Sequence, residues 1–158
     1  MKIGKSILFL FALPLLLAAG CSREPSASKP GKHEHHPPHG GVPVVLGEEA
    51  FHVELVLDAS TGQLQAYVFD GELENFIRSA VPSVEIDATV AGAPRTLILN
   101  AVANPATGET VGDTSLFQGQ ADWLKSAREW DGVFRSITIR GTTFTDVKFN
   151  YPKGNDTD

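Results

Sequence analysis

Short runs of alternating hydrophobic and polar residues fill the chain from Val42 onward, and Gly, Pro, Asn and Asp separate these runs. An alternation with a period of two residues is typical of β-strands that have one buried face. We therefore expect one all-β domain, a single antiparallel β-sandwich of immunoglobulin-like size with seven or eight strands. The pattern predicts strands at 50–58, 63–70, 83–90, 95–102, 116–120, 133–140 and 143–151.

The stretch 122–130 departs from this alternation. Trp123, Ala127 and Trp130 recur near the spacing of a helix, and Asp122 stands where a residue can cap the helix start. We predict a short helix near 122–130 that closes one end of the sandwich. The two tryptophans could instead form a platform for a stacked ligand, but their spacing favours packing against the core.

The first 20 residues have the layout of an export signal. Lys2 and Lys5 precede an apolar run at 7–17, and small residues follow that run. The run is shorter than the roughly 20 apolar residues that a transmembrane helix needs. We therefore predict that residues 1–20 are a signal peptide.

Cys21 follows this segment directly and is the only cysteine of the chain. The run Ala18-Ala19-Gly20-Cys21 resembles the lipobox of bacterial lipoproteins. This resemblance implies cleavage before Cys21, covalent lipid such as palmitate on that residue, and anchoring to a membrane. Ser22, rather than Asp, after the cysteine implies the periplasmic face of the outer membrane. The alternative is a soluble secreted protein with one free thiol.

Charge and sulfur content narrow the chemistry of the mature chain. Cleavage after residue 20 removes two of the 13 basic residues and none of the 19 acidic ones, so the net charge changes from -6 to -8. Such a negative balance makes nucleic acid an unsuitable partner. With Cys21 lipidated and Met1 removed, no thiol or thioether remains, which excludes a blue-copper centre and soft-ligand sites for Cu(I).

The predicted mature chain has three parts. Residues 21–41 are rich in Ser, Pro, Gly, Lys and His without an apolar period, which is typical of a flexible tether. Within it, Gly40 and Gly41 are expected to form a swivel. The β-domain is expected at 42–152, and a disordered polar tail at 153–158.

Four histidines of this tether, His33, His35, His36 and His39, fall within seven residues. Imidazole binds Zn(II) and Cu(II) well, and an unfolded segment can wrap one ion at an entropic cost. We expect moderate affinity, fast exchange, and weaker binding as the pH falls through about 6.5, where imidazoles become protonated. The alternative is a solvated tether whose histidines bind metal only incidentally.

His52 and Glu54 extend this candidate metal site. Residues two apart on a strand point to the same face, and both face solvent if Val53 belongs to the core. His39 is close enough in sequence to approach them and complete a mixed imidazole and carboxylate site. The alternative is that the pair is ordinary polar surface.

Three runs carry a further resemblance: Pro38-His39-Gly40-Gly41, Val44-Val45-Leu46-Gly47 and 51–58. They resemble a segment of poorly characterised bacterial envelope proteins, some of which are associated with heavy-metal efflux adaptors. This resemblance implies metal handling outside the cytoplasm and gives weight to His39 and His52. A metal-efflux protein or another envelope protein is therefore an expected partner.

The motifs of common enzymes do not occur in the chain. It has no G-x-S-x-G, H-E-x-x-H, P-loop or dinucleotide fingerprint, and the predicted domain contains one histidine, His52. We predict a non-catalytic lipoprotein that captures, buffers or delivers Zn or Cu(II). The alternative is an interaction module, in which the tethered β-sandwich docks to another envelope protein through a strand edge or its acidic face.

Overall fold

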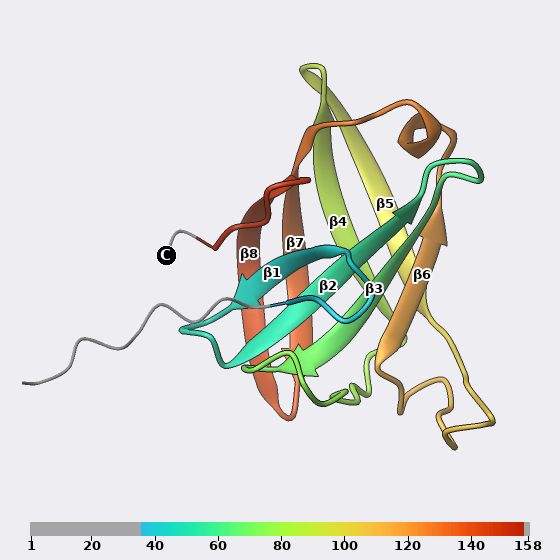
Figure 1. The fold of residues 1–158 in the computed structure, drawn as a ribbon, viewed down its shortest axis with the longest axis vertical. Coiled ribbons are helices and arrows are strands. Elements are labelled where there is room, and N and C mark those ends of the chain that lie inside the picture. Colours follow the sequence, from blue (N-terminus) through green and yellow to red (C-terminus); the bar gives the residue numbers. More distant parts are fainter. Residues whose placement is uncertain (1–35, 157–158) are drawn as a thin grey trace, which may run out of the picture. The chain divides into compact units, whose positions relative to one another are not determined.

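A computed structural model describes residues 36–156 (Figure 1), and it confirms the all-β prediction. Eight strands form one continuous antiparallel sheet in the order β1-β2-β3-β6-β5-β4-β7-β8. Their bounds are β1 Val42–Leu46, β2 Phe51–Asp58, β3 Gln63–Asp70, β4 Ser83–Val90, β5 Ala93–Ala101, β6 Leu116–Gln120, β7 Trp130–Ile139 and β8 Thr142–Tyr151.

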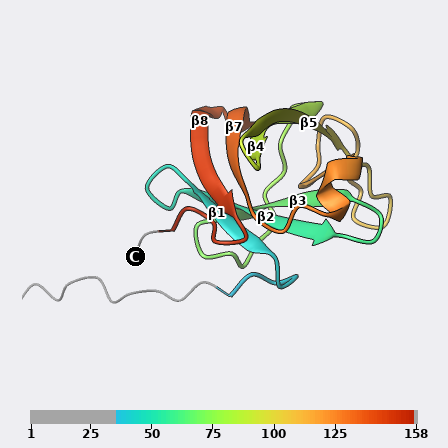
Figure 2. The same cartoon turned by 90° about the horizontal axis from the view of Figure 1, so that it is seen from above.

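The sheet curls so that its two halves face each other, as the layers of a sandwich do. Figure 2 shows β4, β5, β7 and β8 on one side and β1, β2 and β3 on the other. Strand β6 joins the halves because it pairs with both β3 and β5. The domain is therefore nearly barrel-shaped, with its core between the two halves.

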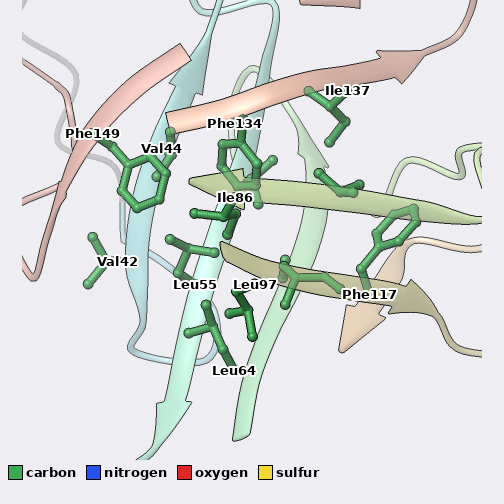
Figure 3. Close-up of a cluster of buried hydrophobic side chains, with 14 of the residues drawn as sticks. Val42, Val44, Leu55, Leu64, Ile86, Leu97, Phe117, Phe134, Ile137 and Phe149 are labelled. Atoms are coloured by element: carbon green, nitrogen blue, oxygen red, sulfur yellow. The ribbon is translucent and has the colours of Figure 1, made fainter. Parts of the chain in front are cut away.

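Aliphatic and aromatic side chains from both halves fill this core. Figure 3 shows Val44, Leu55 and Leu64 from one half near Ile86 and Phe134 from the other. All five are almost completely buried. Burying side chains of this kind contributes roughly 1.5–3 kcal/mol each, which holds the two halves together.

The chain after β8 ties that edge of the sheet to β1. The Asn155 side chain accepts a hydrogen bond from Val45 N at 2.7 Å and donates one to Val45 O at 3.1 Å. Gly154 also exchanges two backbone hydrogen bonds with Asn150. The prediction of a disordered tail from residue 153 is therefore wrong at Gly154 and Asn155, because their polar groups pair with the neighbouring strands.

Replacing Asn155 by alanine tests this closure. The variant leaves both backbone groups of Val45 without their partner, so we expect a loss of about 1–2 kcal/mol in the free energy of unfolding. Urea unfolding of the variant and of Asn100→Ala, an exposed control on β5, gives the comparison. Equal midpoints for the two variants would show that Asn155 does not contribute to closure.

The predicted helix near 122–130 is wrong in its extent. A single 3-10 turn, Asp122–Lys125, is observed, and Trp130 is the first residue of β7. Asp122 does not cap the turn with its side chain, which instead pairs with Lys125 at 2.7 Å. Trp130 is buried against Trp123, so the prediction that the tryptophans pack against the core is confirmed.

Candidate functional site

Strand β2 is buried on both of its faces between His52 and Leu55. Val53 and Leu55 belong to the core, and His52 and Glu54 lie on the opposite face. That face is not open to solvent, because both His52 and Glu54 have an exposed fraction of 0%. The prediction that these two side chains face solvent is therefore wrong.

Two segments cover this outer face. Residues before β1 approach Glu54, and the loop after β3 places Phe76 on Phe69 with ring centroids 4.6 Å apart. Phe69 lies opposite His52 in the register of β2 and β3. The alternation within β2 does not predict that these two segments lie on its outer face, because both come from other parts of the chain.

The carboxylate of Glu54 is the centre of the site. Its Oε1 accepts hydrogen bonds from His39 N and Gly41 N, both at 2.8 Å. Its Oε2 lies 2.7 Å from Nδ1 of the His39 ring. A carboxylate only accepts hydrogen bonds, so this contact assigns the ring proton to Nδ1.

A tight turn brings His39 to this position. Gly40 N donates to Pro37 O at 3.0 Å, and Gly40 has a positive φ of 68°. Gly41 then runs so close to β2 that a Cβ there would lie 2.5 Å from Leu55 O. The two glycines therefore allow docking, and the expected swivel is replaced by a packed turn.

Aromatic rings hold the His39 side chain from another side. Its ring stacks on Tyr67 with centroids 4.0 Å apart and an angle of 14°, and Phe76 lies 6.0 Å away. Burial and the nearby charge of Glu54 raise the pKa of Tyr67. The His39 side chain keeps an exposed fraction of 33%, and Nδ1 is engaged by Glu54, which leaves Nε2 as the ring nitrogen available to a ligand.

The structure brings together only part of the predicted site. His39 and Glu54 are in contact, whereas His52 places Nδ1 3.3 Å from Asp70 O. His36 is exposed. Within residues 36–156, no three His, Cys, Asp or Glu side chains gather as a metal site. His33, His35 and Cys21 lie outside the described residues.

Sequence reasoning missed Tyr67, Phe76 and the docking role of Gly41. Tyr67 could have been found from the sequence, because the alternation of β3 places it on the outer face, opposite Glu54. Phe76 lies in a loop, and nothing in its neighbourhood in sequence indicates that it stacks on Phe69. The turn had a signal as well, since Pro followed two residues later by Gly is typical of a β-turn.

In the part of the chain that the structure describes, no helix has the length and hydrophobicity needed to cross a membrane. Comparison with known proteins found no family model, curated protein or solved structure that matches this chain.

Proposed function

We propose that this chain is a non-catalytic envelope lipoprotein, anchored through lipid on Cys21, that binds Zn or Cu(II) for capture, buffering or delivery. His39 is the ligand whose position is fixed by the fold, and the other histidines of the tether, His33, His35 and His36, supply further ligands. The observation that supports this proposal best is the 2.7 Å contact between His39 Nδ1 and the buried carboxylate of Glu54.

This contact has the form of a metal-ligating histidine with its supporting partner. Histidines that bind metals commonly donate their other ring N–H to a carboxylate, which selects the tautomer and makes the ring a better donor. Glu54 does so for His39 and leaves the lone pair on Nε2. We therefore assign Glu54 a supporting role, because its side chain is fully buried and its Oε2 is already held by His39 Nδ1.

A docked His39 also changes the expected affinity. A wholly flexible tract must order every ligand when the ion binds, at a cost in conformational entropy for each residue. His39 is already held by Glu54 and by stacking on Tyr67. We therefore expect tighter binding to the intact chain than to a free peptide of residues 32–40.

Replacing Glu54 by glutamine tests the supporting role. The amide has the same shape, but its NH2 group donates to His39 Nδ1 and moves the ring proton to Nε2, which blocks the lone pair that binds metal. We expect the affinity for Zn(II) and Cu(II) to fall about 10–100-fold. Isothermal titration of the soluble chain from residue 22 measures this change, with Glu85→Gln as a matched exposed control on β4.

Three further results decide the proposal. His39→Ala should weaken binding at least as much as Glu54→Gln, and replacing His33, His35, His36 and His39 together should abolish it. Binding should also weaken as the pH falls, because protons compete with the metal for the imidazoles. Wild-type binding no tighter than millimolar would contradict the proposal and favour the interaction module.

A further inference from the structure

A pocket of about 320 Å³ adjoins the aromatic cluster around His39. Its lining comes from β3, from the start of β6 and from the loops 71–82 and 102–115. Figure 1 shows these two loops at the lower end of the domain. Tyr67 lines it from β3, and Phe76 lines it from the loop that follows β3. Thr107 and Glu109 line it from the loop that precedes β6. Its volume is within the range of sites that hold small organic ligands.

The polar wall of this pocket is held in place by its own hydrogen bonds. Glu109 accepts from Ser115 N at 2.8 Å, from Ser115 Oγ at 2.6 Å and from Thr107 Oγ1 at 2.7 Å. Burial works against ionisation of Glu109, but the hydrogen bonds from Ser115 and Thr107, with the charge of Arg78, lower its pKa. The pocket is therefore preformed and carries an ionised carboxylate in its wall.

Arg78 also lines the pocket, but its guanidinium is already engaged. Nη1 donates to Asp113 at 2.9 Å, Nη2 donates to Thr107 O at 2.6 Å, and Nε lies 4.0 Å from Glu109. An anionic ligand would have to break these contacts. Asp113 does not line the pocket, but its pairing with Arg78 leaves two carboxylates against one guanidinium, so the surroundings carry a net negative charge, which favours a cation.

The opposite wall is aromatic and open. Phe76 has an exposed fraction of 54%, although its ring is stacked on Phe69. Tyr67 lies beside it, with ring centroids 6.3 Å apart. Aromatic side chains pack against the apolar body of a ligand, and acidic groups beside them attract its cationic end. We propose that this pocket binds a small arylalkylamine, with its ring against Phe76 and Tyr67 and its ammonium group toward the Glu109 side.

Three fluorinated aromatic probes of similar size and different charge test this proposal by 19F NMR titration: 4-fluorobenzylamine, 4-fluorobenzyl alcohol and 4-fluorobenzoate. The amine should bind most tightly, about tenfold more than the alcohol, and the benzoate least. Phe76→Ala should weaken amine binding at least fivefold. Ile98→Ala removes another exposed hydrophobic side chain, outside the pocket, and should leave binding unchanged.

The titrations are run with a chelator present, so that failure of metal binding does not affect them. Urea unfolding of both variants shows whether each is folded before it is titrated. Benzoate binding as tightly as the amine would overturn the charge argument. The pocket assignment would be overturned if the 19F signal of no probe broadened. It would also be overturned if folded wild type and folded Phe76→Ala bound the amine equally well.

Discussion

Trp130→Ala is expected to destabilise the domain by about 4 kcal/mol, because it removes the largest fully buried side chain of the core. The indole is 2% exposed, and the rings of Trp123, Phe149 and Tyr151 each lie 5.5 Å from it. These rings are held by the backbone of the 3-10 turn and of β8, so they cannot all collapse into the cavity that alanine leaves. Small domains have a total stability of about 5–15 kcal/mol, so the variant is expected to be marginally folded.

Two matched variants and a urea titration measure this effect. Trp123→Ala removes a half-buried ring from the edge of the same cluster, and we expect a smaller loss, about 1–2 kcal/mol. Trp130→Phe should also lose less than the alanine variant, because it keeps an aromatic ring in the cavity. It gives up no hydrogen bond, since Trp130 Nε1 has no hydrogen-bond partner among the described residues. If both alanine variants lose the same stability, the cluster is not organised around Trp130.

Glu54→Ala is expected to lower the free energy of unfolding by about 3 kcal/mol. The carboxylate is fully buried and accepts from three donors, His39 N, Gly41 N and the His39 ring. Hydrogen bonds to a charged group contribute about 1.5–3 kcal/mol to stability. A buried donor that is left without a partner lowers the stability more than an exposed one does. The turn before β1 should detach from β2 in this variant.

The glutamine variant separates stability from metal binding. Glu54→Gln retains an oxygen that accepts from both backbone donors, so we expect it to keep most of the stability while losing metal affinity. Glu85→Ala, on the exposed face of β4, should lie within about 0.5 kcal/mol of the wild type. Urea unfolding gives all three values. Equal values for Glu54→Ala and Glu85→Ala would contradict the role of Glu54 in docking the turn.

Much of the strand content could be read from local alternation. The bounds of β3, β4 and β6 agree with the sequence prediction, because each has one face in the core and one outside. Strand β1 was not singled out, since its sequence VPVVL contains Pro43 and lacks alternation of polarity. The start of β7 was missed because Trp130 also fits a helical spacing with Trp123.

The candidate site was predicted in part. A period of two placed His52 and Glu54 on one face, and the short separation in sequence suggested that His39 approaches them. Their exposure was predicted wrongly because polar side chains on an outer face normally meet water. In this chain the turn at Pro37–Gly40 brings His39 onto Glu54, and Phe76 stacks on Phe69, which lies opposite His52 on the same face.

By itself, the sequence determined the all-β class and most strand positions, because these depend on a periodicity within a few residues. Only the tertiary structure decided that Glu54 is buried and bound to His39, and that Asn155 pairs with Val45. The first pair is 15 residues apart and the second 110. Such contacts depend on how the sheet curls, and no local pattern records that geometry.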